Sequence, residues 1–248
     1  MTTVLKLGGS VITEKNRAET LDGPALDAAA DAVADALASD AVGRLVIVHG
    51  GGSFGHHHAD AHGVSTTDGT TDHVAVTDVH GAMTTLNRFV RSRLHDRDVP
   101  AVPVHPLSAA SRDADGNLSL PTAQVETLLD EGFVPVLHGD GVAHAGEGVT
   151  VLSGDEIVTS LAASVDADRV GLCSTVPGVL DADDDVIPTV ESFDAVADVL
   201  GASDTTDVSG GMAGKVQELL ALAAPASIFG PEALDGFLDG ERVGTLIE

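Results

Sequence analysis

Three segments of the chain combine paired glycines with a reactive cationic or imidazole side chain. They are Lys6-Leu7-Gly8-Gly9-Ser10, the run from His49 to His58, and the run from Ser209 to Lys215. Paired glycines let backbone N–H groups approach an oxyanion closely, because no Cβ stands in the way. A helix that begins after such a pair adds partial positive charge. Together these features predict a site that binds phosphate groups.

Two common phosphate-binding motifs are absent from these segments. The run that ends at Lys215 is too short for a Walker A loop, and Val216 stands where that loop needs a Mg²⁺-binding Ser or Thr. The glycines after His49 do not follow the G-x-G-x-x-G pattern of dinucleotide-binding proteins. The sequence therefore predicts a phosphate site of another type and gives no support to a nicotinamide cofactor.

Short apolar strands alternate along the chain with amphipathic helices. The expected strands cover residues 3–7, 45–48, 102–104, 133–137, 169–174, 227–229 and 243–247. The expected helices cover residues 24–39, 73–97, 124–131 and 211–223, with one more beginning after the capping-box pair Ser153 and Glu156. Residues 139–152 are rich in glycine and predict a β-hairpin or an irregular excursion rather than a helix.

This alternation predicts an α/β fold, with an open and mostly parallel sheet sandwiched between helices. Ligands of such sheets bind beyond the carboxyl ends of the strands, so the first two glycine segments should lie side by side. The sequence contains no internal repeat or linker, and we expect residues 1–248 to form a single domain.

The composition is strongly acidic, with 39 Asp and Glu against 12 Lys and Arg and a formal net charge of -27. This balance argues against nucleic acid and anionic membranes as partners, because both require a basic surface. Hydrophobic residues make up 43% of the chain, which predicts a packed core despite the acidity. We expect a salt-adapted protein, since concentrated salt screens the repulsion among its carboxylates.

Cys173 is the single cysteine, which excludes an intramolecular disulfide and favours a cytoplasmic location. It lies in an apolar strand, so we expect a buried and inert thiol. No apolar run approaches the roughly 20 residues of a membrane-spanning helix.

Lysine is unusually scarce, since only Lys6, Lys15 and Lys215 are lysines among the 12 cationic residues. Lys6 and Lys215 lie in glycine segments, and Lys15 follows the first segment closely. All three are therefore expected to face phosphate.

The order of these motifs resembles the amino acid kinase superfamily. The similarity rests on Lys6-x-Gly8-Gly9-Ser10, Gly50-Gly51-Gly52, Ser153-Gly154-Asp155 and Gly210-Gly211-Met212-x-x-Lys215. Within the superfamily, the isopentenyl phosphate kinase branch is similar at Lys15, at the run from His49 to His56, and at Val134-Pro135-Val136-Leu137-His138-Gly139-Asp140. Fosfomycin kinases share much of this pattern.

The resemblance implies a small-molecule kinase that uses ATP and Mg²⁺. It implies in-line transfer of the γ-phosphoryl group of ATP to isopentenyl phosphate, which gives isopentenyl diphosphate and ADP in an alternative mevalonate route to isoprenoids. It also implies a homodimer. The acceptor phosphate is expected on the side formed by residues 1–150, and the nucleotide on the side formed by residues 151–248.

The resemblance further implies a role for each matching residue. The catalytic set comprises Lys6, Lys15, His56, Asp155 and Lys215. ATP is expected to contact Lys6, Gly8, Gly9, Ser10, Gly52, Thr175, Gly210, Gly211 and Lys215, and the acceptor to contact Gly51, Gly55, His56 and Gly154. Lys15 is expected to stabilise the transferring group and Asp155 to orient lysines. Ser174-Thr175-Val176-Pro177-Gly178-Val179 stands where many relatives have Thr-Asp-Val-Asp-Gly-Val.

Two other functions are compatible with these residues. One is a kinase of the same fold that acts on fosfomycin, a nucleoside monophosphate or an acyl carboxylate. The other is a nucleotide-binding storage or regulatory protein without turnover, although binding ATP alone requires neither Lys15 nor His56.

The remaining histidines are not assigned to catalysis. His58 and His62 have the i, i+4 spacing of metal ligands, but the Glu of an H-E-x-x-H motif is missing, so no metal site is predicted. His49 is expected to fix the glycine loop, and His138 to act similarly. Met83 is expected to belong to the core.

Overall fold

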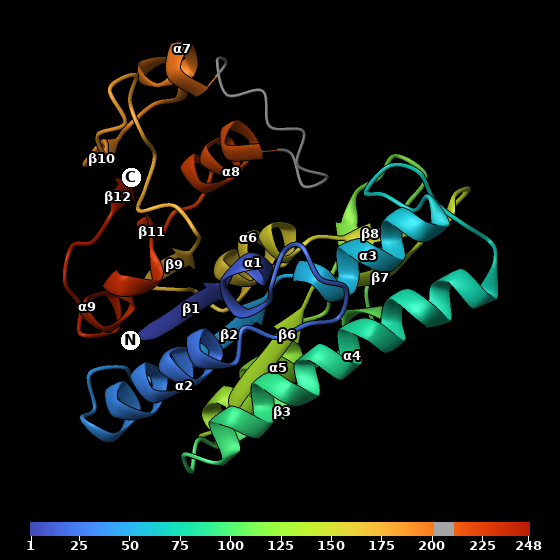
Figure 1. Ribbon diagram of the computed structural model, residues 1–248, viewed down its shortest axis with the longest axis horizontal. Coiled ribbons are helices and arrows are strands. Elements are labelled where there is room, and N and C mark those ends of the chain that lie inside the picture. Colours follow the sequence, from blue (N-terminus) through green and yellow to red (C-terminus); the bar gives the residue numbers. More distant parts are fainter. Residues whose placement is uncertain (201–210) are drawn as a thin grey trace.

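The structure of the chain is a computed structural model, and it describes residues 1–200 and 211–248 (Figure 1). The predicted nucleotide contact at Gly210 lies outside these residues. None of the described helices is long and apolar enough to span a membrane.

Among the described residues, eight strands form the main sheet, in the order β10-β12-β11-β9-β1-β2-β6-β3. Their bounds are β1 (Thr2–Leu7), β2 (Arg44–His49), β3 (Ala101–Pro103), β6 (Val134–His138), β9 (Arg169–Cys173), β10 (Thr189–Val190), β11 (Ala226–Phe229) and β12 (Thr245–Ile247). All neighbours pair in parallel except β11 and β12, which run antiparallel. The predicted open and mostly parallel sheet is confirmed.

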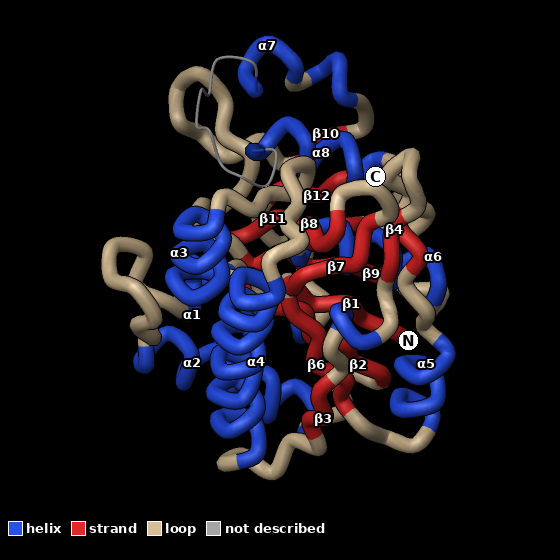
Figure 2. Tube along the Cα trace, turned by 90° about the vertical axis from the view of Figure 1, so that its right-hand side faces the viewer, coloured by secondary structure: helices blue, strands red, loops and turns tan. Residues whose placement is uncertain are grey.

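Helices cover both faces of this sheet. The first face is covered by α1 (Gly9–Ile12), α2 (Gly23–Ala38), α3 (Gly52–His62), α4 (His73–His95) and α9 (Leu234–Leu238). The second face is covered by α5 (Ala123–Asp130), α6 (Gly154–Ser164) and α8 (Gly211–Leu220), while α7 (Ala197–Leu200) lies next to α8. Figure 2 shows α1 to α4 on one side of the strands and α5 with α6 on the other.

Strand alternation decides which side chains reach each face. In β1, Leu5 and Leu7 pack into the core under α2 and α4, whereas Val4 packs into the core under α6. Lys6 shares the face of Val4, because successive side chains of a strand point to opposite faces. The lysine is thereby directed toward the beginning of α6.

A smaller sheet lies beyond the carboxyl end of β6. It consists of β4 (Ser111–Arg112), β5 (Leu118–Ser119), β7 (Asp140–His144) and β8 (Gly148–Leu152), in the order β5-β4-β7-β8. Strands β7 and β8 form the predicted hairpin, with Asp140 opposite Leu152. The hairpin returns the chain to Ser153, where the predicted capping box with Glu156 starts α6. The hairpin therefore places the start of α6 beside the ends of β1 and β2.

Candidate active site

A cavity of about 430 Å³ lies at the carboxyl ends of the central strands. All three lysines of the chain line it. The predicted site residues that line it are Lys6, Gly8, Gly9, Ser10, Lys15, Gly51, Gly52, Gly55, His56, Gly154, Asp155, Thr175 and Lys215. Gly211 is not part of the lining, but its carbonyl oxygen lies 3.5 Å from Lys215 Nζ. Residues predicted from separate motifs are thus brought together around one space.

The first two glycine loops touch each other at the floor of this cavity. A Cβ built on Gly9 would lie 2.1 Å from the nitrogen of Gly52, and one on Gly50 would lie 2.6 Å from the nitrogen of Gly9. No side chain fits at such distances from a backbone. Gly52 also has a φ of +48°, in the left-handed region that favours glycine. Only glycines allow these loops to approach so closely.

Thr13 joins the two loops and is a residue that the motifs did not reveal. Its buried hydroxyl donates to the carbonyl of Gly9 at 2.8 Å and accepts from the backbone N–H of Ser53 at 2.9 Å. Ser53 follows Gly52 in α3, so one hydroxyl links both glycine segments. The link spans 40 residues of sequence, which is why no local pattern indicated it.

Asp155 lies between two of the lysines. Lys6 Nζ donates to Asp155 Oδ1 at 2.6 Å, and Lys215 Nζ lies 3.8 Å from Asp155 Oδ2. The side chains of Lys6 and Asp155 are only 11% and 7% exposed. Burial lowers the pKa of Lys6, and the charge of Asp155 opposes this effect. Burial favours the neutral amine of Lys6, and the carboxylate of Asp155 therefore stabilises the charged ammonium form in this enclosed position.

Lys15 and His56 are exposed and line the outer part of the cavity. Lys15 lies in the loop between α1 and α2, which is closed by a bridge between Thr13 and Leu21. The backbone N–H of Glu19 in this loop donates to the carbonyl of Ser53 at 3.1 Å. Since Ser53 belongs to α3, which also carries His56, the exposed side chains of Lys15 and His56 belong to connected segments.

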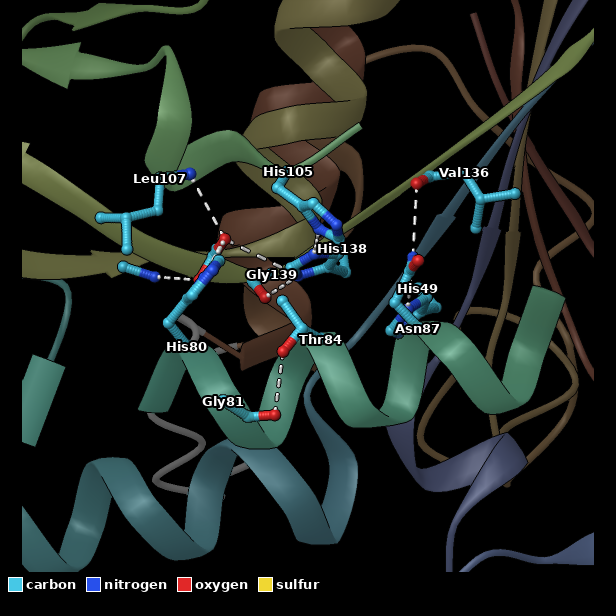
Figure 3. A network of polar contacts seen from close by, with 12 residues as sticks. His49, His80, Gly81, Thr84, Asn87, His105, Leu107, Val136, His138 and Gly139 are labelled. Carbon is cyan, nitrogen blue, oxygen red and sulfur yellow. Dashed lines mark hydrogen bonds and ion pairs between the residues drawn. The ribbon is translucent and has the colours of Figure 1, made fainter. Parts of the chain in front are cut away.

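Two buried histidines, His49 and His138, form hydrogen bonds with the backbone of the loops that follow their strands (Figure 3). His49 Nδ1 lies 3.1 Å from the carbonyl oxygen of Gly50, and its Nε2 lies 3.2 Å from Asn87 Nδ2. An amide nitrogen can only donate, so Nε2 accepts and Nδ1 carries the proton that is donated to Gly50. Burial lowers the pKa of His49 to about 3. The ring is therefore a neutral brace of the glycine loop, as the sequence predicts.

A second buried histidine makes a similar contact at the next strand. His138 Nδ1 lies 2.8 Å from the carbonyl oxygen of Gly139, and its Nε2 lies 2.8 Å from His105 Nδ1. The rings of His138 and His49 stack with their centroids 5.5 Å apart. Burial lowers the pKa of His138 to about 4. The neutral rings of His49 and His138 thus hold the adjacent loops that begin at Gly50 and Gly139 through hydrogen bonds to their backbone carbonyls.

Asp140 lines the cavity and is fully enclosed by protein donors. It accepts from His80 Nδ1 at 2.9 Å and from the backbone N–H groups of Gly141 at 2.9 Å and Leu107 at 3.3 Å. The hydrogen bond to Asp140 raises the pKa of His80. Figure 3 shows His80 extending from its helix toward the side of the network where Leu107 lies. The predicted motif contained Asp140, but His80 is 60 residues away in sequence.

One wall of the cavity is apolar. It is formed by Ala59 of α3, Val79 and Met83 of α4, and Val151 and Leu152 of β8. Met83 is 2% exposed and belongs to the core as predicted, yet its side chain also faces the cavity. The site thus combines a cationic end with an apolar wall.

Cys173 ends β9 beside the first glycine loop, and its carbonyl accepts the N–H of Gly8 at 2.9 Å. Burial raises the pKa of its thiol to about 12. A thiol with such a pKa is not a nucleophile near neutral pH. The expectation of a buried and inert cysteine agrees with this geometry.

A parallel α/β sheet whose glycine loops and lysines surround one cavity defines a phosphate-transferring or phosphate-binding protein. The model of the amino acid kinase family matches residues 1–228, and the chain belongs to that family. Its sequence relatives include isopentenyl phosphate kinases. The one from Haloferax volcanii is 62% identical over 244 residues, which cover 98% of this chain and 97% of the relative.

More distant relatives carry the same name. The isopentenyl phosphate kinase of Methanocaldococcus jannaschii is 31% identical over 87% of this chain and 85% of its own length. A solved isopentenyl phosphate kinase structure superposes with a TM-score of 0.84 at 26% identity and covers 100% of both chains. The family that the motifs predicted is confirmed.

Proposed function

We propose that this chain transfers the γ-phosphoryl group of ATP to isopentenyl phosphate, with isopentenyl diphosphate and ADP as products. The observation that carries the proposal is the convergence of Lys6, Lys15 and Lys215 on one cavity, within a chain that contains no other lysine. The 62% identity to a named isopentenyl phosphate kinase supports the choice of acceptor.

The donor phosphates are assigned to the inner part of the cavity. Lys6 and Lys215 carry the positive charge there, and Asp155 keeps both ammonium groups in place. The N–H group of Gly8 is already bonded to the carbonyl of Cys173, so Gly8 contributes only close backbone approach. The proposed nucleotide contacts are completed by the side chain of Thr175 and by the N–H groups of Gly9, Ser10, Gly52 and Gly211. A Cβ at Gly8 would lie 2.9 Å from the carbonyl of Cys173, so the loop fits only without side chains.

The acceptor phosphate is assigned to the outer part of the cavity. His56 and the N–H group of Gly51 at the start of α3 would hold it, and Gly154 at the start of α6 would contact it. The N–H of Gly55 is bonded to the carbonyl of Gly51, so Gly55 would contact the acceptor only through its lack of a side chain. A helix N-terminus attracts anions through its free N–H groups. The wall formed by Ala59, Val79 and Met83 fits the apolar prenyl group.

The chemistry requires alignment and charge neutralisation more than a protein nucleophile. An oxygen of the acceptor phosphate forms the new bond to the γ-phosphorus, while the bond from that phosphorus to the β,γ-bridging oxygen breaks and its electrons leave with ADP. The acceptor oxygen is already anionic near neutral pH, so no general base is needed. Lys15, between the two phosphates, stabilises the charge on the transferring group.

Mg²⁺ belongs to the proposal as the ion carried by the ATP phosphates, and it supplies further charge neutralisation. The buried carboxylates at the cavity already have partners, since Asp155 binds Lys6 and Asp140 binds His80. They therefore fit a role in orienting cations better than one as direct ligands of the ion.

ADP release with a panel of acceptors tests the proposal. We expect turnover with isopentenyl phosphate and little with fosfomycin, nucleoside monophosphates or acyl carboxylates. We expect His56→Ala to raise KM for isopentenyl phosphate while leaving KM for ATP nearly unchanged. Absence of turnover with isopentenyl phosphate would refute the assignment, and turnover with another acceptor would identify the alternative kinase.

The proposal includes a cytoplasmic homodimer. A cytoplasmic location suits a chain whose single thiol is buried and unpaired. Light scattering coupled to size-exclusion chromatography in concentrated KCl measures the oligomeric state directly, and a monomeric mass would contradict the dimer.

A further inference from the structure

Four side chains with metal-binding groups meet where α3, α4 and the Lys15 loop come together. His58 and His62 lie one turn apart on α3, so their rings project from the same face of the helix. Asp78 reaches this face from α4, with Oδ2 at 3.0 Å from His62 Nε2. Glu19 of the loop places Oε1 at 2.5 Å from His58 Nε2.

The donor atoms are close enough for one ion. One ligand atom from each of His58, His62 and Asp78 lies within 4.8 Å of the other two. In a tetrahedral zinc site with bonds of 2.0–2.1 Å, neighbouring ligand atoms are about 3.4 Å apart. Rotations of these partly exposed side chains can close this difference, which is at most about 1.4 Å, without moving the helices.

The chemistry of the donors indicates which ions fit. Two imidazole nitrogens with carboxylate oxygens suit Zn²⁺, Co²⁺ or Ni²⁺, whereas Mg²⁺ and Ca²⁺ prefer oxygen ligands alone. The two carboxylates also balance the charge of a divalent cation. We propose that His58, His62 and Asp78 form a binding site for a divalent transition metal ion, with Glu19 as a fourth ligand.

The proposal reverses the expectation drawn from the sequence, which predicted no metal site because the Glu of an H-E-x-x-H motif is missing. Asp78 is 16 residues from His62, and Glu19 is 39 residues from His58. No local motif could therefore contain the set.

A bound ion would join three segments of the protein. Glu19 belongs to the loop that carries Lys15, and His58 and His62 belong to the helix that carries His56. The loop and the helix are otherwise connected near this point through Ser53. The site is thus a clamp between two segments that line the cavity, and it does not depend on the identity of the acceptor.

Binding is tested on the full chain without a polyhistidine tag, after treatment with EDTA and in the absence of ATP and acceptor. We expect one Zn²⁺ per chain by calorimetry and the absorption bands of tetrahedral Co²⁺. His62→Ala and Asp78→Asn should each weaken binding by at least about tenfold. His57→Ala and His73→Ala, at exposed histidines outside the cluster, should bind like the original chain.

Limited trypsin digestion tests the clamp. Cleavage after Lys15 and Arg17, both exposed in the loop, should slow severalfold when Zn²⁺ is bound, and His62→Ala should abolish the protection. Equal Zn²⁺ affinity in the original chain and in His62→Ala would overturn the site. Binding without protection would overturn the clamp. Because no substrate is present, neither result bears on the phosphoryl transfer.

Discussion

Replacing Asp155 with Asn tests whether this carboxylate maintains the charge of the buried lysine. Lys6 Nζ donates to Asp155 Oδ1 at 2.6 Å, and both side chains are nearly enclosed. Removing one member of a buried ion pair costs about 3–5 kcal/mol, because the other charge remains without a partner. Asn can still accept a hydrogen bond from Lys6, so we expect the lower end, about 3 kcal/mol.

This cost has a measurable effect on stability. A loss of 1 kcal/mol lowers the Tm of a chain of this size by roughly 2–4 °C, so Asp155→Asn should melt about 9 °C earlier. Calorimetry in concentrated KCl measures the shift. Asp115→Asn is the matched control, because it removes one carboxylate from an exposed position and leaves the lysines untouched.

Activity gives an independent measure of the same pair. The pKa of Lys6 is already lowered by burial, and the substitution removes the charge that raises it. We therefore expect kcat to fall by at least about 100-fold near neutral pH. We also expect kcat of the variant to decrease further as the pH rises, since Lys6 loses its proton earlier than in the original chain. An unchanged melting temperature together with an unchanged pH profile would refute the reasoning.

Four further outcomes follow from the site and the composition. Lys15→Ala should lower kcat by at least about 100-fold with little change in ATP affinity measured by calorimetry, and unchanged turnover would remove this lysine from the mechanism. Gly9→Ala should abolish turnover and destabilise the fold, since its Cβ would lie 2.1 Å from a backbone nitrogen, whereas Gly23→Ala, with no atom within 4 Å of its Cβ, should be tolerated. The pKa values of His49 and His138 are lowered from 6.5 to about 3 and about 4, so the unfolded chain binds protons first as the pH falls. The free energy of unfolding measured in urea should then be lower at pH 5 than at pH 7 by about 2 kcal/mol per histidine. If the free energy of unfolding of His49→Asn depended on pH as strongly as that of the original chain, His49 would not be the cause. The Tm should rise strongly from dilute to molar KCl, and a salt-independent Tm would disprove adaptation through charge screening.

Much of the fold could be predicted because its signals are local. Apolar strands, the hairpin over 139–152 and the capping box at Ser153 each depend on neighbouring residues. The first two glycine loops were predicted to be adjacent because the carboxyl ends of parallel strands lie at the same edge of a sheet. Leu7 of β1 pairs with His49 of β2, so the two loops do begin side by side. Helix α3 was not predicted, because its sequence, Gly-Ser-Phe-Gly-His-His-His-Ala-Asp-Ala-His, has few apolar residues.

The candidate site was predictable only for the residues within motifs. Thr13, Asn87 and His80 support the loops through contacts that span 40, 38 and 60 residues of sequence. Nothing in their neighbours distinguishes them from ordinary polar residues of a helix or loop. Their roles depend on the packing of α4 and the smaller sheet, which periodicity alone does not determine.

The convergence of all three lysines on one cavity also makes amine chemistry selective. Apart from the N-terminal amine, a reagent that acylates amines can react only inside this site. Lys15 is exposed, whereas Lys6 is buried against Asp155, so the reagent should reach Lys15 first. A fluorophore or crosslinker aimed at lysine would thus report on occupancy of the cavity without any engineered residue.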